Sequence, residues 1–295
     1  MSDPLSYKLK KKFDRYIHDP IIAIVILPFF VILKILPYKI SSFICGCLLF
    51  LIAPFSKYQK RVLHNLNIAF PKKSKREKIQ ISKQFWFNFG QIIGELPHID
   101  KLINSEKLVT IGHEKIQNGP AILIGAHLAN WEFLLRVGEV SGRRVGFVYR
   151  PINNWILNKL QFARNSKIDA DFFKKGRLAA IGMANKLKNG EVIGLTNDQI
   201  LREGIMVPFF GKKAPTPHAA AIMSLKWNVP IFMVRLERID MFNFKMTIED
   251  EIKIKTNKKF DDKVYKLTEV ISQRIEQWII ERPEQWLWAH RRWGK

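Results

Sequence analysis

The chain has 295 residues, and its 49 Lys and Arg residues against 26 Asp and Glu residues give a formal charge of +23. Its 47% apolar content, with 21 Phe and 8 Trp, can bury a substantial core, which excludes intrinsic disorder and a mini-protein scaffold. Such a basic surface must meet an anionic partner: nucleic acid, a phosphate-bearing membrane or an acidic protein. The two cysteines, Cys45 and Cys47, lie in an apolar stretch and supply neither a disulfide framework nor a spaced metal site.

Residues 1–56 are predicted to form a membrane anchor. A basic start precedes two apolar runs, at residues 20–37 and 40–55. A spanning helix needs about 20 apolar residues, and each run falls slightly short of that length. A single span and a shallow hairpin both fit this pattern, with the main domain on the cytoplasmic face, and two buried core helices are the alternative. No small-residue cleavage site precedes the second run, so we expect the segment to be retained.

The segment that follows the anchor, residues 57–83, is strongly basic. Nine Lys and Arg residues stand against Glu77 alone, so its local charge is +8. This position favours contact with anionic lipid headgroups, where each cation contributes about 1 kcal/mol. Nucleic acid is the weaker alternative, because no zinc-finger, RNP or basic-zipper pattern accompanies the charge. Ser74 and Glu77 form a capping box that predicts a helix running to about Glu95.

From Leu108 onward, strand and helix patterns alternate, which predicts an α/β fold with a mixed, largely parallel sheet flanked by helices. We assign residues 57–295 to this second domain. The predicted strands are Leu108–Ile111, Ala121–Ile124, Val145–Tyr149, Val192–Thr196, Ile231–Leu236 and Phe244–Ile248. The predicted helices are Ala129–Val140, Asn154–Arg164, Leu178–Leu187, Pro217–Trp227 and Asp261–Ile280. The absence of a Walker loop, GxGxxG or GxSxG motif argues against the common nucleotide-binding and hydrolase functions.

His127 follows a buried predicted strand that ends in Gly125-Ala126, and α/β proteins place their sites at the carboxyl ends of strands. Glu132 is five residues further on, and on a regular helix that spacing would turn it about 500° around the axis. The two side chains converge only if His127 lies in the turn and Glu132 in the helix. The carboxylate can then hold one imidazole nitrogen and leave the other as a general base. A histidine that merely caps the strand or helix end is the structural alternative.

Seven motifs follow one another in order over about residues 55–293. They are Arg61-x3-Asn65-Leu66-x3-Phe70-Pro71, Gly125-Ala126-His127-x4-Glu132, Tyr149-Arg-Pro-Ile-Asn-Asn154, Lys188-Asn-Gly-Glu-Val192, Asp198-Gln199, Val207-Pro-Phe-Phe-Gly211 and Arg282-Pro-Glu-Gln-Trp-Leu-Trp-Ala-His-Arg-Arg-Trp293. Together they resemble the bacterial lipid A late acyltransferases, the lauroyl/myristoyl transferase family within the lysophospholipid acyltransferase group. The last motif is especially specific to that family.

The resemblance implies transfer of a fatty acyl group, lauroyl-like, from acyl carrier protein to a hydroxyl of a Kdo-lipid A precursor in lipopolysaccharide biosynthesis. It also implies a position at the cytoplasmic face of the bacterial inner membrane. Because a thioester donor is already activated, the enzyme must only deprotonate an alcohol and stabilise an oxyanion, and we expect no acyl-enzyme, cofactor or metal.

In this interpretation His127 is the general base and Glu132 orients it. By analogy with the wider group, backbone N–H groups at the start of the helix after Gly125 bind the oxyanion or a substrate phosphate. The same chemistry on another lysophospholipid or glycolipid acceptor is one alternative. A non-enzymatic basic protein that binds membranes or nucleic acid is an alternative of another class.

Three further residues are candidates for substrate binding. Arg150 follows a buried strand, where a guanidinium can clamp a sugar phosphate or else bind a local carboxylate. Arg164 falls near a family arginine that lines the site, although its spacing from Tyr149 is one residue shorter than the family pattern. Asp198 ends a strand and either positions substrate or satisfies the backbone of the next loop.

The remaining motifs are interpreted mainly as structural. Val207–Gly211 could wall an acyl channel, but two adjacent Phe residues are more typical of a core. His290, with Arg291 and Arg292 beside it, is interpreted as packing and attraction to headgroups rather than catalysis.

Overall fold

The computed structural model describes residues 13–103, 105–165, 167–255, 257 and 259–294, without the side chains of residues 162–165. The helices are α2 (Asp19–Ile35), α3 (Tyr38–Ile52), α4 (Lys57–Ala69), α5 (Lys75–Glu95), α6 (Ile99–Ile103), α7 (Val137–Ser141), α8 (Trp155–Asn165), α9 (Arg177–Lys188), α10 (Ala219–Trp227) and α11 (Phe260–Glu281). The strands are β1 (Leu108–Ile111), β2 (Ala121–Gly125), β3 (Val145–Tyr149), β4 (Ala170–Lys174), β5 (Val192–Thr196), β6 (Ile205–Phe209), β7 (Lys212–Thr216), β8 (Ile231–Arg238) and β9 (Phe244–Glu251).

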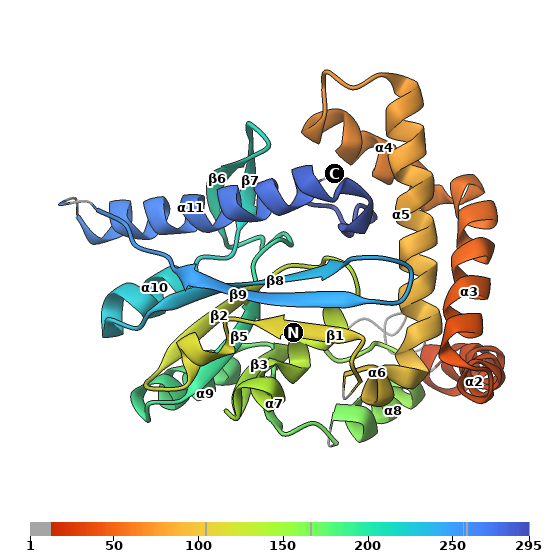
Figure 1. Cartoon of the computed structure of the whole chain (residues 1–295), viewed down its shortest axis with the longest axis horizontal. Coiled ribbons are helices and arrows are strands. Elements are labelled where there is room, and N and C mark those ends of the chain that lie inside the picture. Colours follow the sequence, from red (N-terminus) through yellow and green to blue (C-terminus); the bar gives the residue numbers. More distant parts are fainter. Residues whose placement is uncertain (1–12, 104, 166, 256, 258, 295) are drawn as a thin grey trace.

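Seven of these strands form one sheet in the order β1-β9-β8-β2-β5-β3-β4. The β8–β9 pair is antiparallel, and the other neighbouring pairs in this sheet are parallel. Helices lie on both sides of the sheet, as α11 and α7 do in Figure 1, so the central strand β2 is buried along its whole length. The predicted mixed, largely parallel α/β fold is confirmed.

The six predicted strands are present, but β4 and the β6–β7 hairpin were not predicted. Each of the hairpin strands contains a proline, Pro208 or Pro215, which a two-stranded hairpin tolerates because both of its strands have an unpaired edge. The predicted helix Ala129–Val140 is wrong. Its first residues form a non-helical turn, which is followed by a 3-10 helix, Trp131–Arg136, and then by the short α7.

The predicted helix after Ser74 is confirmed as α5, and the capping box with Glu77 is formed. Helix α3 packs against α5 with very little space between the two backbones. A Cβ atom added at Gly90 would lie 2.1 Å from the Cys45 carbonyl oxygen, and one added at Gly94 would lie 2.3 Å from that of Ser41. These two glycines of α5 therefore make the close approach possible.

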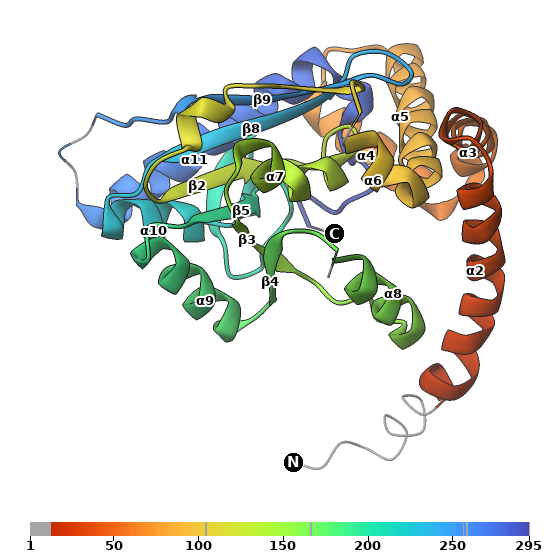
Figure 2. The ribbon, with the colours of Figure 1, turned by 60° about the horizontal axis from the view of Figure 1, so that its bottom comes forward.

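Two helical segments at the amino-terminal end are long and apolar enough to cross a membrane, judged by length and composition: Asp14–Ile35 and Tyr38–Phe55. Figure 2 shows α2 leading away from the sheet, with α3 beside α5. Large apolar side chains of both segments are exposed, including Ile35 at 78% and Phe55 at 90%.

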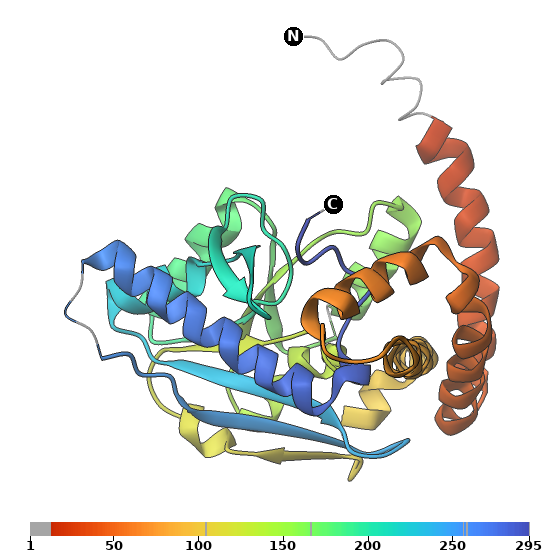
Figure 3. The ribbon, with the colours of Figure 1, turned by 90° about the horizontal axis from the view of Figure 1, so that it is seen from above.

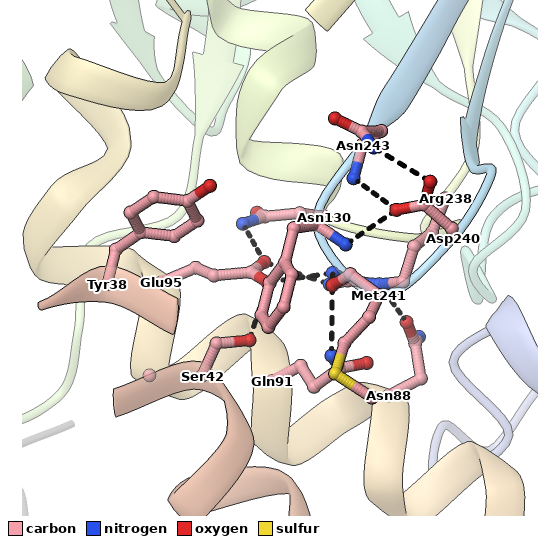
Figure 4. Close-up of polar contacts among 12 residues, drawn as sticks. Tyr38, Ser42, Asn88, Gln91, Glu95, Asn130, Arg238, Asp240, Met241 and Asn243 are labelled. Atoms are coloured by element: carbon pink, nitrogen blue, oxygen red, sulfur yellow. Dashed lines mark hydrogen bonds and ion pairs between the residues drawn. The ribbon is translucent and has the colours of Figure 1, made fainter. Parts of the chain in front are cut away.

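A buried ion pair joins the end of β8 to α5 (Figure 4). The Arg238 guanidinium donates from Nη1 and Nη2 to the two carboxylate oxygens of Glu95, at 2.7 and 2.9 Å, and from Nε to Asn88 at 2.9 Å. Glu95 also accepts from the hydroxyl of Ser42 on α3, at 2.8 Å, and from the amide of Asn130, at 2.9 Å. One carboxylate thus links α3, α5, β8 and the turn that follows β2.

We predict that Arg238→Met lowers the free energy of unfolding by about 3–5 kcal/mol, because it leaves the Glu95 carboxylate buried without its cation. Chemical unfolding followed by tryptophan fluorescence measures the loss. The matched control is Arg144→Met, which removes ion pairs to Asp169 and Asp171 from an arginine whose side chain is 53% exposed and should cost below about 1 kcal/mol. Equal losses in the two variants would contradict the structural role given to the buried pair.

Candidate active site

The candidate residues gather at the carboxyl edge of three neighbouring parallel strands. His127 follows β2, Asp198 and Gln199 follow β5, and Arg150 follows β3. Because β2, β5 and β3 are adjacent and parallel, their carboxyl ends meet at one edge of the sheet. Residues separated widely in the sequence are therefore brought into one site.

The carboxylate that holds the imidazole of His127 is that of Asp198. Nδ1 of His127 lies 2.8 Å from Oδ1 of Asp198, and the backbone N–H of His127 donates to Oδ2 at 2.9 Å. The indole N–H of Trp286 donates to the same Oδ2 at 2.8 Å. Asp198 is only 1% exposed, so these three donors surround a buried carboxylate and fix its orientation.

Within the His127–Asp198 pair, the pKa of the histidine is raised and that of the aspartate is lowered, so the charged form of each side chain is favoured. Burial alone would lower the pKa of His127, but the charge and hydrogen bond of Asp198, and to a smaller extent the charge of Glu132, raise it above its ordinary value. Burial would raise the pKa of Asp198, but the charge of His127 and the hydrogen bonds from His127 and Trp286 lower it to about 2. Asp198 therefore remains ionised at neutral pH, whereas His127 can exchange a proton there.

Glu132 lies near His127, and its charge helps to raise the pKa of that histidine. His127 is in the turn and Glu132 is in the 3-10 helix, and both line the same cavity. The carboxylate that accepts the hydrogen bond from Nδ1 of His127 is that of Asp198. The carboxylate of Asp198, which was predicted to bind substrate, is enclosed by protein donors and is not among the groups that line the cavity.

The turn between β2 and the 3-10 helix is held in a strained conformation. Ala129 has a φ of 48°, a value that residues other than glycine seldom adopt. Its N–H donates to the Gln285 carbonyl at 3.0 Å, and Leu128 forms an isolated antiparallel bridge with Trp286. The next residue, Asn130, is tied to Glu95 (Figure 4). The strain is thus balanced by contacts on both sides of the turn.

The expected backbone oxyanion donors are not provided by the first residues of this turn. The N–H of His127 donates to Asp198, that of Leu128 donates to the Ala126 carbonyl, and that of Ala129 donates to Gln285. No α-helix begins directly after Gly125. The prediction of a helix N-terminus that binds the oxyanion at this point is therefore wrong.

The carboxyl-terminal segment, residues 283–294, supplies Trp286 to Asp198 and His290 to the cavity lining. It is anchored by α4, where Arg61 donates to the Ala289 carbonyl at 3.0 Å. Asn65 donates to the carbonyls of Trp288 and His290 at 2.8 and 2.7 Å. Figure 3 shows this segment, dark blue, running back from the end of α11 toward α4. The first and last motifs of the sequence comparison thus form one structural unit.

His290 and Arg292 have structural roles, and the expected attraction to headgroups is not supported for either side chain. The ring of His290 accepts a hydrogen bond from the N–H of Ile200 at 3.0 Å, and burial lowers its pKa to about 4. It is therefore neutral at physiological pH. Arg292 is fully buried over the ring of Phe209 and donates to Pro215 and Thr216.

The second imidazole nitrogen of His127 faces a cavity of about 1030 Å³. The amide nitrogen of Gln199 lies 3.0 Å from Nε2, and the ring of Trp131 is centred 5.4 Å from the imidazole. The polar lining includes His127, Glu132, Arg150, Gln161, Lys175, Gln199, Arg202, Glu203 and His290, and the apolar lining includes Leu123, Leu134, Phe147, Phe172, Met183, Leu195 and Val234. A cavity of this size with a long apolar wall suits a large ligand that has an alkyl chain.

The other residues singled out in the sequence lie partly on the cavity lining and partly in the core. Arg150 is exposed and lines the cavity. Arg164 belongs to α8, but its side chain lies outside the described part of the structure. Val207 and Phe209 are fully buried and do not line the cavity, so the core interpretation of that motif is confirmed. Among the described residues, no group of three or more His, Cys, Asp or Glu side chains could hold a metal ion.

The roles of Trp286 and Gln199 were not predicted from the sequence. The available signal was that both residues lie in motifs that carry the family resemblance. Their partners lie 88 and 72 residues away in the chain, so no local spacing could have paired them with Asp198 and His127.

Comparisons with known proteins identify the family of the chain. Residues 10–295 match the family described as bacterial lipid A biosynthesis acyltransferase. The chain is similar to a lipid A biosynthesis palmitoleoyltransferase of Escherichia coli (strain K12), with 23% identity over 276 residues that cover 87% of this chain and 86% of the relative. A lipid A biosynthesis acyltransferase of Shigella flexneri matches with the same identity and coverage. The chain belongs to the bacterial lipid A biosynthesis acyltransferase family, and it is an acyltransferase.

Proposed function

We propose that the chain transfers a fatty acyl group from acyl carrier protein to a hydroxyl of a Kdo-lipid A precursor, with His127 as the general base. The observation that carries this proposal is His127, which is held by the buried Asp198 and lines a large, partly apolar cavity. Asp198 holds Nδ1 and directs Nε2 toward the cavity, where an acceptor hydroxyl can reach it. The family supports the reaction type, and the geometry supports the residue that performs it.

In the proposed reaction, Nε2 of His127 takes the proton of the acceptor hydroxyl as that oxygen attacks the thioester carbonyl. A carbon–oxygen bond forms, and the carbonyl electron pair moves onto its oxygen. When the tetrahedral intermediate collapses, the carbon–sulfur bond breaks and the departing thiolate takes the proton from Nε2. Asp198 stays ionised and stabilises the imidazolium that exists between these two steps.

Basic side chains on the cavity lining support a phosphorylated acceptor. Arg150, Lys175 and Arg202 are exposed cations that line the cavity together with His127. Guanidinium groups bind phosphate oxygens bidentately, which is a suitable way to hold a phosphorylated sugar beside the base. Arg150 is therefore proposed as an acceptor ligand. Arg164 remains a proposal that rests on the family pattern alone.

Acyl carrier protein is proposed as the donor because of charge. Such carriers are small acidic proteins, whereas this chain has a formal charge of +23, so opposite charges should steer the encounter.

The proposed function is tested by incubating the enzyme with a tetra-acylated Kdo-lipid A precursor and a set of acyl-carrier-protein and coenzyme A thioesters. The product should gain the mass of one acyl group, and the carrier-protein donor should have the higher kcat/KM at low salt.

Absence of any mass gain would contradict the proposed acceptor. Acylation of a lysophospholipid alone would support the same chemistry on another acceptor. If the coenzyme A thioester has an equal or higher kcat/KM at all salt concentrations, acyl carrier protein is not the preferred donor and this part of the proposal fails.

Membrane association is proposed to occur through α2 and the outer face of α3 at the cytoplasmic side of the inner membrane. Exposed apolar residues of the amino-terminal segments include Ile21, Ile24, Val25, Ile32, Ile35, Phe43, Leu48, Leu51, Ile52 and Phe55. A continuous apolar surface of this kind is typical of a membrane-binding face. The basic segment 57–83 follows it directly and would add attraction to anionic headgroups.

We predict that His127→Ala lowers kcat by about 10²–10⁴-fold while the protein stays folded, because the variant loses the general base. Glu132→Ala and Asp198→Asn should also lower kcat, since one removes a charge near His127 and the other replaces the anionic acceptor of the Nδ1–H by a neutral amide. Acyl transfer is measured as radiolabelled product, with thermal unfolding as the control for folding. Near-normal turnover by a folded His127→Ala variant would remove the proposed mechanism.

The raised pKa of His127 predicts the pH dependence of the reaction. The base must be neutral, so kcat/KM should rise with pH and reach half of its maximum above pH 6.5. In Asp198→Asn the charge that raises the pKa is lost while burial, which lowers it, remains. The midpoint should therefore move to lower pH, and an unmoved midpoint would count against the pairing.

We predict that the double variant Ile24→Glu and Val25→Glu, which places two charges on the exposed face of α2, reduces recovery of the protein with vesicles of phosphatidylethanolamine and phosphatidylglycerol. Flotation on a density gradient measures the bound fraction. The matched control is Val109→Glu, at a 55% exposed position of β1, which should float like the wild type. Equal flotation of the double variant and the control would contradict the assignment of α2 to the membrane.

A further inference from the structure

The acyl transfer reaction requires a hydrogen-bond donor for the oxyanion, and the turn after β2 does not offer its first three N–H groups. Those of His127, Leu128 and Ala129 all donate within the protein. A donor elsewhere on the cavity lining, close to Nε2 of His127, can supply this hydrogen bond. The side-chain amide of Gln199 meets each of these requirements.

We propose that Gln199 is a second catalytic residue, whose amide caps Nε2 of His127 in the free enzyme and donates to the oxyanion during acyl transfer. The proposal rests on the proposed function of His127 as the general base. It assigns to Gln199 a direct contact with the reacting carbonyl oxygen of the thioester.

The hydrogen bonds around His127 define the direction of the contact with Gln199. The Nδ1–H donates to the ionised Asp198, so Nε2 carries the lone pair. The group 3.0 Å from Nε2 is the amide nitrogen of Gln199, which must therefore be the donor. In the free enzyme the base is thus occupied by a hydrogen bond that the acceptor hydroxyl has to replace.

The backbone around Gln199 is fixed on both sides. The preceding Asn197 donates its N–H to the Gly125 carbonyl at 3.3 Å, and the following Ile200 donates its N–H to Nε2 of His290 at 3.0 Å. The neutral state of His290, whose pKa is lowered to about 4, keeps that ring able to accept. The side chain of Gln199, by contrast, extends into the cavity through rotatable bonds. A small rotation of the amide is therefore possible without movement of the loop.

During the proposed reaction the amide of Gln199 exchanges its partner, Nε2 of His127, for the oxyanion. The acceptor hydroxyl takes the place of the amide at Nε2, about 3 Å from that nitrogen. As its oxygen bonds to the thioester carbon, Nε2 takes the proton and the carbonyl electron pair moves onto the carbonyl oxygen. The displaced amide of Gln199 remains within hydrogen-bond distance of the carbonyl oxygen and donates an N–H to this oxyanion. Collapse restores the carbonyl, breaks the carbon–sulfur bond and sends the proton from Nε2 to the thiolate.

Gln199→Met tests this proposal, because it keeps the size of the side chain and removes the donor. We expect kcat to fall by about 10²–10³-fold, as for loss of one oxyanion donor, with little change in KM. The midpoint of the pH profile should also move to higher pH. A donor to the lone pair favours neutral imidazole, so its loss raises the pKa of His127. This shift is opposite to that expected for Asp198→Asn.

Two further variants separate catalysis from structure. Gln161→Met removes another amide from the same cavity, one that accepts from the N–H of Ile152 at 3.3 Å, and should leave the midpoint of the pH profile at the wild-type value. Gln199→Glu, of almost the same shape, replaces a neutral donor by an anion and should lower kcat and raise the midpoint as well. Gln199→Glu serves as the test if thermal unfolding shows that the Gln199→Met variant is not folded.

The outcomes distinguish this inference from the function on which it rests. A folded Gln199 variant with kcat within about threefold of the wild type and an unmoved midpoint, beside an inactive His127→Ala variant, would overturn the role of Gln199 alone. An active His127→Ala variant would overturn the proposed function itself. Loss of kcat with an unchanged pH midpoint would also overturn the contact between Gln199 and Nε2.

Discussion

The buried carboxylate of Asp198 is the constraint on which the site depends. A charge that is 1% exposed is costly unless it is fully compensated, and here the compensation comes from the ring and backbone of His127 and from the indole of Trp286. These donors belong to the turn after β2 and to the carboxyl-terminal segment, whereas Asp198 follows β5. Stabilising one buried charge therefore also fixes the orientation of the imidazole.

A second buried carboxylate, Glu95, supports the same turn from the opposite side. It holds Asn130, and Leu128 forms a bridge with Trp286, so the strained Ala129, at φ 48°, lies between two anchored neighbours. Glu95 also accepts from Ser42 of α3, a helix whose outer face is apolar and exposed. The helix proposed to meet the membrane and the turn that carries His127 thus share one hydrogen-bonded carboxylate.

Much of the fold could be predicted from local patterns, because buried parallel strands and amphipathic helices have distinct periods in the sequence. The position of His127 at the end of β2 could be predicted for the same reason. The partner of its Nδ1 could not, because Asp198 is 71 residues away and only the order β2-β5 brings the two together. The nearby Glu132 was the natural choice from spacing alone. The helix expected from Ala129 failed because long-range contacts with Trp286 and Gln285 override the local pattern.

The most direct test of the account is the protonation of His127 itself, observed by nitrogen NMR of the detergent-solubilised enzyme with labelled histidine. Signals of His127 are identified by their loss in the His127→Ala variant. The pairing with Asp198 predicts a neutral ring that carries its proton on Nδ1 and a pKa of His127 above the ordinary value of 6.5. A neutral ring protonated on Nε2, or a pKa below 6.5, would contradict the pairing with Asp198 and with it the role of His127 as the base.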